Sequence, residues 1–290
     1  MTNEPWTVLK LINWTKEFFA RNNVDSPRLA AEILLAHVLG CSRIDLYARF
    51  NHEPTPDQLK QFRQMVKRAQ QHEPVAYLLG EKEFYSLGFK VTPDVLIPRP
   101  ETEIVVTEAT RYLRSLGRPG TMWDLGTGSG CIAIATARQV DDVKVLATDI
   151  SEGAVSVARE NAERHDLADR VRVRQADLLA LPEDCDDLRP FDVITANLPY
   201  VRQSDPIGAS VKHEPKVALY GGDADGLSLI RRMAPQLPSM IAPEGVLIME
   251  FGIDQGDDIR DLISDTDEFT EPQILRDLND LERILVAYKL

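Results

Sequence analysis

The chain has 290 residues, of which 43% are hydrophobic and 27% are charged, proportions typical of a soluble globular protein. Its net charge of −13 disfavours a nucleic acid substrate, because such binding depends on Lys and Arg side chains that neutralise phosphates. The cysteines Cys41, Cys131 and Cys185 form no CxxC pair, which argues against a disulfide framework or a metal site. The N-terminal segment lacks the pattern of a signal peptide, and no apolar run reaches the roughly 18 residues of a spanning helix. We therefore expect a cytoplasmic protein that does not bind a membrane.

The first part of the chain shows helical periodicity only, over residues 5–72. One predicted helix has Pro27 in its first turn and stops at Gly40, the positions that these two residues favour. We predict an all-helical N-terminal domain over residues 1–74 and interpret it as a substrate-recognition domain. A purely structural appendage is the alternative.

Residues 75–98 have a different pattern, in which aromatic and β-branched residues alternate around Gly80 and Gly88. This pattern is typical of a β-hairpin. We expect the hairpin to link the helical domain to the remainder of the chain.

From residue 99 to residue 290, strand patterns alternate with helical ones, which predicts an α/β protein with a doubly wound sheet. Ser151 is the expected N-cap of one of the intervening helices. The predicted strands are residues 121–125, 143–149, 171–175, 191–197, 245–251 and 283–290.

A glycine-rich turn, GTGSG, lies between the first of these strands and a helix and contains Gly126, Gly128 and Gly130. Glycine allows a tight turn and the close approach of a ligand to the backbone. The dinucleotide pattern GxGxxG would require a glycine where this chain has Cys131, so an NAD-linked oxidoreductase is disfavoured. Asp124 precedes the turn, and no P-loop lysine follows it.

Two further carboxylates follow the next two strands. Asp149 ends the second strand, where a carboxylate can accept hydrogen bonds from both ribose hydroxyls, and Asp177 follows the third, where it can hold an adenine amino group. Together with the glycine turn, they indicate an adenosyl cofactor at the carboxyl edge of the sheet. At this point the chain resembles the class I S-adenosylmethionine methyltransferases. The resemblance implies a Rossmann-like seven-stranded sheet whose last strand is antiparallel, and S-adenosyl-L-methionine as cofactor.

The tetrapeptide Asn197-Leu198-Pro199-Tyr200 follows the fourth strand. It resembles the (Asn/Asp/Ser)-Pro-Pro-(Tyr/Phe) motif of methyltransferases that act on nitrogens conjugated to a π system. Such a nitrogen is a poor nucleophile, so the site must orient it through acceptors for its N–H bonds. We expect these acceptors to be the Asn197 side-chain oxygen and the Leu198 carbonyl, with Tyr200 as a stacking surface. Leu198 departs from the proline of the motif, which leaves the subclass open at this stage.

Two longer segments narrow the subclass: VLIPRPETE (residues 95–103) and HEPKVALYGGDADGLSLIRR (residues 213–232). With the hairpin and the helical N-terminus, they resemble the bacterial and organellar protein-(glutamine-N5) methyltransferases that modify peptide chain release factors. The intact RPETE favours this branch over a sister enzyme that methylates a ribosomal-protein glutamine. Two competing hypotheses are an adenine-N6 methyltransferase that acts on nucleic acid and a non-catalytic binding protein.

The family resemblance implies that the side-chain amide of the glutamine in the release factor GGQ motif receives the methyl group, and we expect a monomeric enzyme. Arg99 and Glu101 are expected to order the mouth of the site and to bind substrate; alternatively, this segment is a capped helix start with Thr102. We do not expect His213 or Cys131 to be catalytic. The predicted catalytic residues, which also bind substrate, are Asn197, Leu198, Pro199 and Tyr200. The predicted cofactor site comprises Asp124, Gly126, Thr127, Gly128, Ser129, Gly130, Asp149, Ile150, Asp177, Leu178 and Asn197.

Overall fold

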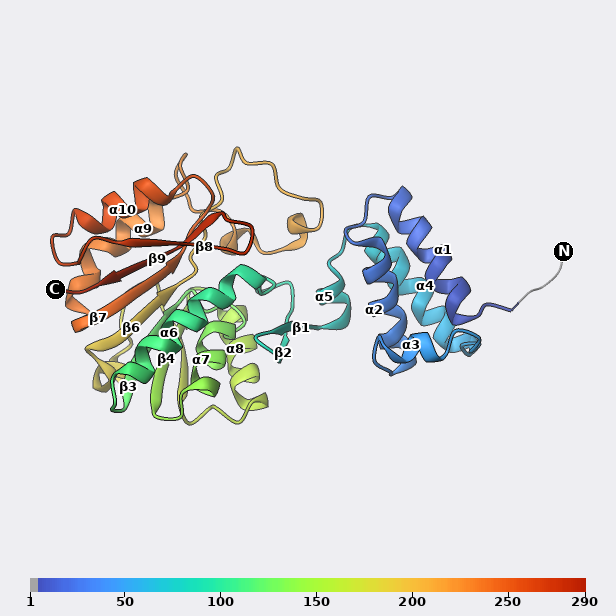
Figure 1. The fold of residues 1–290 in the computed structure, drawn as a ribbon, viewed down its shortest axis with the longest axis horizontal. Coiled ribbons are helices and arrows are strands. Elements are labelled where there is room, and N and C mark those ends of the chain that lie inside the picture. Colours follow the sequence, from blue (N-terminus) through green and yellow to red (C-terminus); the bar gives the residue numbers. More distant parts are fainter. Residues whose placement is uncertain (1–4) are drawn as a thin grey trace. The chain divides into compact units, whose positions relative to one another are not determined.

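The computed structural model describes residues 5–290, so the part of the sequence predictions that concerns residues 1–4 lies outside it. The chain divides into two compact units (Figure 1). Unit 1 holds the described residues up to Gly80 together with Gly208–His213, and unit 2 holds Glu81–Ile207 and Glu214–Leu290. Among residues 5–290, no helix combines the length and the apolar character needed to cross a membrane.

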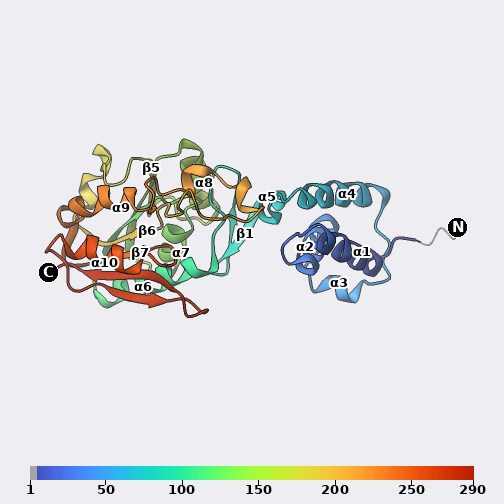
Figure 2. The ribbon, with the colours of Figure 1, turned by 90° about the horizontal axis from the view of Figure 1, so that it is seen from above.

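Unit 1 is helical, and Figure 2 shows its long helices from above. Its helices are α1 (Val8–Arg21), α2 (Pro27–Leu39), α3 (Asp45–Ala48), α4 (Pro56–Gln70) and α5 (Val75–Leu79). Pro27 occupies the first turn of α2, and Gly40 ends that helix in the left-handed conformation, as the sequence predicts. A capping box between Thr55 and Gln58 begins α4. Apolar side chains of these helices, with Phe19 at the centre, form a separate core.

A short segment from the second half of the chain belongs to unit 1. It contains a 3₁₀ turn, η3 (Val211–His213). The Ser210 hydroxyl donates to Asp25 at 3.0 Å, and His213 Nε2 lies 3.1 Å from the Gln71 carbonyl oxygen. Unit 1 is therefore built from two stretches of sequence.

The predicted hairpin occupies only part of residues 75–98. Residues 75–79 form the single helical turn α5, which Gly80 ends with a φ of +72°. The antiparallel hairpin consists of β1 (Glu81–Phe84) and β2 (Leu87–Lys90), joined by a tight turn in which Tyr85 and Ser86 both have positive φ.

Within residues 5–290, unit 2 contains one seven-stranded sheet of order β5-β4-β3-β6-β7-β9-β8. Its strands are β3 (Gly120–Leu125), β4 (Val143–Asp149), β5 (Val171–Gln175), β6 (Phe191–Ala196), β7 (Ile241–Glu250), β8 (Gln273–Arg276) and β9 (Glu282–Tyr288). The strands β3 to β7 pair in parallel, and β9 pairs antiparallel with both β7 and β8. The predicted fold class, including the antiparallel last strand, is confirmed. The short edge strand β8 was not predicted.

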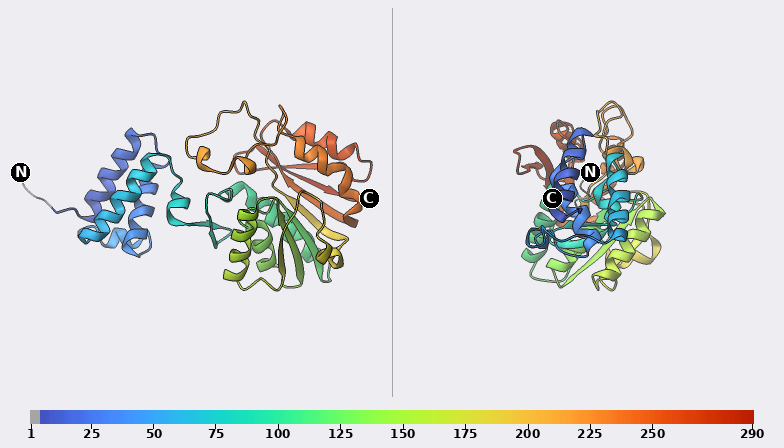
Figure 3. Two further views of the ribbon diagram at one scale, coloured as in Figure 1. Left: turned by 180° about the vertical axis from the view of Figure 1, so that it is seen from behind. Right: turned by 90° about the vertical axis from the view of Figure 1, so that its right-hand side faces the viewer.

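Helices cover both faces of this sheet (Figure 1). They are α6 (Glu103–Ser115), α7 (Cys131–Gln139), α8 (Glu152–Arg164), α9 (Ser228–Met233) and α10 (Gly256–Ser264), with 3₁₀ turns η1 (Pro100–Thr102), η2 (Glu183–Leu188), η4 (Lys216–Ala218) and η5 (Ala234–Ser239). The helices α6, α7 and α8 share a core with Met122 and Val193, whereas α9 and α10 share one with Trp123 and Ile194. Neighbouring residues of a strand face opposite sides, so each strand contributes to both cores. Ser151 caps α8 as predicted, and Figure 3 shows this helix, in yellow-green, beside the edge strand β5.

Candidate active site

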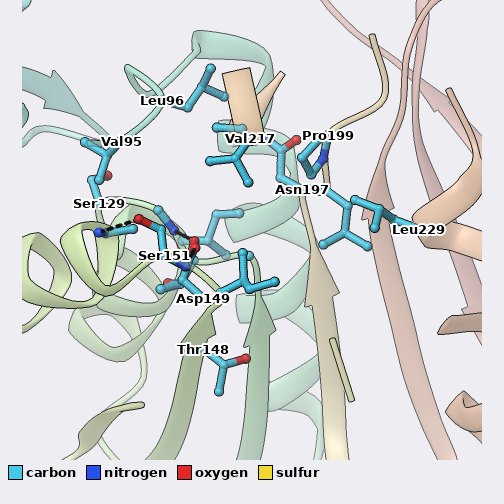
Figure 4. Close-up of a pocket in the computed structure, with 18 of the residues that line it drawn as sticks. Val95, Leu96, Ser129, Thr148, Asp149, Ser151, Asn197, Pro199, Val217 and Leu229 are labelled. Atoms are coloured by element: carbon cyan, nitrogen blue, oxygen red, sulfur yellow. Dashed lines mark hydrogen bonds between the residues drawn. The ribbon is translucent and has the colours of Figure 1, made fainter. Parts of the chain in front are cut away.

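A cavity of about 250 Å³ lies in unit 2, at the edge of the sheet where the parallel strands end. Figure 4 shows Asp149 and Ser151 on one side of it and Asn197 and Pro199 on the other. Because the carboxyl ends of parallel strands meet at one edge, residues far apart in sequence converge here. The sequence-predicted residues that line the cavity are Arg99, Gly126, Thr127, Gly128, Ser129, Asp149, Ile150, Asp177, Leu178, Asn197, Leu198 and Pro199.

Four predicted site residues lie outside the lining of this cavity: Asp124, Gly130, Tyr200 and Glu101. Asp124 lies under the glycine turn, and Gly130 lies at its end. The Tyr200 hydroxyl is hydrogen-bonded to a buried carboxylate, that of Glu250. Tyr200, which we predicted as a stacking surface for the substrate, therefore does not line the cavity. Glu101 is partly exposed in η1, beside the site and outside the cavity lining.

The glycine turn joins β3 to α7, and its three glycines all have positive φ, from +55° to +81°. A Cβ at Gly126 would lie 3.1 Å from Leu198 Cδ2, and one at Gly130 would lie 3.0 Å from Ile134 Cδ1. A Cβ at Gly128 would meet nothing within 4 Å, so the surface of the turn beside the cavity is open. Backbone conformation and close packing thus both require glycine in this turn.

Asp124 is completely buried beneath the turn. Its two carboxylate oxygens accept hydrogen bonds from the hydroxyls of Thr127 at 2.6 Å and Thr195 at 2.7 Å. The Thr127 amide in turn donates to the Thr148 carbonyl at 2.9 Å. Burial raises the pKa of Asp124 to about 6, although its hydrogen bonds act in the opposite direction. Asp124 therefore shapes the turn from below.

Asp149 ends β4 and lines the cavity. Its carboxylate accepts hydrogen bonds from the backbone amides of Gly128 and Ser151, both at 2.9 Å. Burial raises the pKa of Asp149, and the backbone hydrogen bonds oppose that shift. Each oxygen keeps a further lone pair for an incoming hydroxyl. This arrangement fits the two hydroxyls of a ribose.

Beyond Asp149, the cavity wall is formed by Ile150, Leu178 and an ion pair. Ile150 is 53% exposed, which leaves an apolar surface at the cavity. Arg232 from α9 pairs with Asp177 at 2.6 Å, and both side chains are about half exposed. Sequence reasoning predicted Asp177 but not Arg232, because nothing in the local pattern of α9 indicates a partner 55 residues away.

The tetrapeptide after β6 is held by a buried carboxylate that sequence reasoning missed. Glu250, the last residue of β7, is 1% exposed. It accepts hydrogen bonds from Asn197 Nδ2 at 3.0 Å, from the Thr102 hydroxyl at 2.6 Å and from the Tyr200 hydroxyl at 3.1 Å. The one available signal was a glutamate at the carboxyl end of a predicted apolar strand. Thr102 makes no side-chain cap for α6, so the capped-helix interpretation is wrong for its hydroxyl.

The glycine-containing segment 219–227 packs against the backbone of the tetrapeptide. Val201 donates its amide to the Leu219 carbonyl at 2.8 Å and accepts from the Gly221 amide at 3.1 Å. Gln255 Nε2 bridges the carbonyls of Tyr200 and Asp225, at 3.1 and 2.7 Å. These contacts explain why the GGDADGL sequence (221–227) belongs to the site although none of its residues lines the cavity.

Arg99 lines the cavity and forms an ion pair of 2.5 Å with Glu214, whose side chain is 2% exposed. Glu214 also accepts a hydrogen bond from the Ile97 amide at 3.0 Å. His213 belongs to unit 1 and does not line the cavity. Burial raises the pKa of the Cys131 thiol to about 12, so this cysteine stays protonated at neutral pH.

The fold and this site define a class of protein. A seven-stranded sheet with an antiparallel last strand, an open glycine turn and carboxylates after successive strands are the features of a class I S-adenosylmethionine-dependent methyltransferase. The family model described as a methyltransferase domain matches residues 119–267. A solved methyltransferase from Pyrococcus furiosus aligns with a TM-score of 0.51 at 18% identity, over 80% of this chain and 98% of its own, which shows the fold.

The particular family follows from the sequence comparisons. The model described as the PrmC N-terminal domain matches residues 10–80. The release factor glutamine methyltransferase of Rhodopirellula baltica is 41% identical, over 98% of this chain and 97% of that protein. The enzyme of the same name from Geobacter sulfurreducens is 38% identical, over 98% of each chain. The chain belongs to the release factor glutamine methyltransferase family, which confirms the predicted family, the enzyme class and the methyl donor.

Proposed function

We propose that this enzyme transfers the methyl group of S-adenosylmethionine to the side-chain amide nitrogen, N5, of the glutamine in the GGQ motif of a peptide chain release factor. One observation carries the proposal. Asn197 and Leu198, at the end of β6, border the same cavity as the glycine turn and Asp149. The same site therefore contains hydrogen-bond acceptors for an amide and a binding surface for an adenosyl group.

The proposed roles follow from the chemistry of an amide. Its nitrogen lone pair is delocalised, so the nitrogen reacts only when its position and direction are fixed. The Asn197 side-chain oxygen and the Leu198 carbonyl would each accept one N–H bond of the glutamine. Neither oxygen accepts a hydrogen bond from any residue in the described range 5–290. Orientation of this kind can lower a barrier by several kcal/mol, up to about 10. The bound cofactor would supply an electrophilic methyl group on a sulfonium. As the nitrogen–methyl bond forms, the sulfur–methyl bond breaks, S-adenosylhomocysteine leaves as a neutral thioether, and one amide proton passes to water.

The residues that would hold the cofactor form a continuous wall. The open backbone at Gly128 supports contact with the cofactor, and Asp149 would accept from the ribose hydroxyls. Ile150 and Leu178 would enclose the adenine ring, with Asp177 beside its amino group. The carboxylate beneath the glycine turn would act indirectly, by holding the turn in place.

Recognition of the protein substrate is assigned to unit 1, the β1–β2 hairpin and the segment around Arg99 and Glu101. Exposed Trp6 and Trp14 in unit 1 offer apolar surface to a partner, which supports this assignment. We further propose that the enzyme acts as a monomer in the cytoplasm.

Transfer of a radiolabelled methyl group tests the proposal. The purified enzyme is incubated with labelled S-adenosylmethionine and a release factor from the same organism. Matched reactions contain a release factor whose GGQ glutamine is replaced, a ribosomal protein fraction and nucleic acid. The proposal predicts label in the wild-type release factor alone. Label in nucleic acid or in a ribosomal protein would keep the cofactor site and overturn the choice of substrate.

A further inference from the structure

Three hydrogen-bond donors converge on the buried Glu250 carboxylate at the floor of the site. Thr102 comes from η1, Asn197 from the loop after β6, and Tyr200 from the end of the tetrapeptide. Thr102 Oγ1 also lies 3.3 Å from Asn197 Nδ2. The NH₂ end of the Asn197 side chain is therefore turned toward Glu250 and Thr102.

We infer that Glu250 is a positioning residue for methyl transfer, because it fixes which end of the Asn197 side chain faces the substrate. An ionised carboxylate can only accept hydrogen bonds, so the asparagine must present its NH₂ group to Glu250. The side-chain oxygen of Asn197 is then left as the acceptor in the cavity. A rotated amide would instead present donors to the N–H bonds of the substrate. The inference rests on the proposed function, in which Asn197 accepts from the target nitrogen.

The surroundings of Glu250 are consistent with this role. Burial raises its pKa, and the negative charge of Glu101 acts in the same direction. The hydrogen bonds from Thr102 and Tyr200 and the positive charge of Arg283 favour the ionised form. A protonated Glu250 would carry a donor of its own and would no longer specify the orientation of the amide. Transfer should therefore weaken as the pH falls through the pKa of Glu250.

Two substitutions at Glu250 separate its charge from its hydrogen bonds. In Glu250→Gln, the new carbonyl oxygen can still accept from Asn197 and Thr102, while its NH₂ group donates to a Tyr200 hydroxyl that has turned to accept. Like protonated Glu250, this glutamine carries a donor, so we expect its kcat to equal the low-pH limit of the wild-type enzyme, up to about tenfold below the neutral value. The fall in kcat at low pH that is due to Glu250 should be absent. Glu250→Leu removes the acceptors, and we expect kcat to fall roughly a hundredfold, the order observed when one preorganised group is removed. The dissociation constant of the cofactor should stay within about threefold in both variants.

A rescue experiment tests whether Glu250 acts through Asn197. Asn197→Asp places a second carboxylate against Glu250, and we expect transfer to collapse. In the double variant Asn197→Asp/Glu250→Gln, the glutamine NH₂ group can donate to the new aspartate, whose other oxygen is an acceptor in the cavity. We expect kcat of the double variant to be at least about tenfold higher than that of Asn197→Asp alone, because the repulsion between the two carboxylates is removed. A residue that merely supports the fold would give no such rescue.

The control variant is Asp192→Leu, at the opposite end of β6. Asp192 is also buried and accepts from Arg118 and from the Thr121 amide, so its removal should lower thermal stability without lowering kcat. If wild type labels the release factor but Glu250→Leu keeps full kcat, or the double variant shows no rescue, the positioning role is wrong. If wild type itself does not label the release factor, the proposed function fails instead. If Glu250→Leu does not fold, the positioning role of Glu250 is still tested by Glu250→Gln and by the comparison of Asn197→Asp with Asn197→Asp/Glu250→Gln.

Discussion

Gly221 lies directly against Gly226, so that a Cβ on Gly221 would be 1.8 Å from the Gly226 carbonyl oxygen and 2.7 Å from that of Pro199. The small size of Gly221 is thus needed for close packing behind the tetrapeptide. Gly221 is not among the described glycines that have a positive φ, so the requirement here is space and not backbone conformation.

This contact predicts the effect of Gly221→Ala. The added methyl group must displace the backbone next to Pro199, and overpacking of this kind costs roughly 1–3 kcal/mol of stability. We expect kcat to fall at least about tenfold as well, since small displacements of positioning groups are costly. Urea unfolding and methyl transfer measure the two effects. Gly208→Ala is the matched control, because its Cβ would meet nothing closer than 3.9 Å. Equal behaviour of the two variants would contradict the packing argument.

Asp149 and Asn197 are predicted to have separable roles. Asp149→Ala removes the acceptor for the Gly128 and Ser151 amides, and we expect the dissociation constant of the cofactor to rise roughly 10- to 100-fold, as hydrogen bonds to a charged group are worth about 1.5–3 kcal/mol. Asn197→Ala should nearly abolish turnover and leave cofactor affinity within a few-fold of wild type. Titration calorimetry and single-turnover transfer separate the effects. The same loss of cofactor affinity in both variants would refute this division.

The raised pKa of Asp124 predicts a specific dependence of stability on pH. Its pKa is about 6 in the folded protein and near 3.8 when unfolded, so the folded state binds the proton more tightly. The contribution of Asp124 to the free energy of unfolding is then fully present below about pH 4 and is lost as the pH rises to about 6. The total change is on the order of 3 kcal/mol.

Comparison with Asp124→Asn isolates this contribution. We expect the difference in free energy of unfolding, wild type minus variant, to decrease between about pH 4 and pH 6. Urea unfolding at a series of pH values provides the measurement. A difference that is constant across this range would show that Asp124 has an ordinary pKa in the folded protein.

The Arg99–Glu214 pair predicts a compensating double substitution. Arg99→Leu leaves the buried Glu214 carboxylate with its hydrogen bond from the Ile97 amide but without its ion-pair partner. We expect the free energy of unfolding to fall by about 2 kcal/mol, less than for a fully buried pair because Arg99 is 29% exposed. Glu214→Gln keeps an acceptor for Ile97 and removes the charge, so Arg99→Leu/Glu214→Gln should regain most of the stability. Thermal unfolding of the four proteins in the cycle measures the coupling. Additive losses would mean that the pair does not couple.

The sequence by itself determined the fold class and much of the cavity wall. The GTGSG turn and Asp149 follow strands whose periodicity is readable, and parallel strands must bring their carboxyl ends to one edge. The same reasoning placed Asn197 beside them. The short edge strand β8 escaped prediction because its two end residues are exposed and its two central ones are only partly buried, so the pattern shows no alternation.

Only the tertiary structure decided which side chains form the buried hydrogen-bond cluster behind the cavity lining. Glu250 meets Asn197 across 53 residues of sequence and Thr102 across 148, and these contacts depend on strand order and on how η1 packs against the sheet. The turning of Tyr200 toward Glu250, and the inclusion of Gly208–His213 in unit 1, have the same origin. Periodicity and motifs report on a residue's own strand or loop, whereas a buried hydrogen-bond cluster forms only when separate elements pack together.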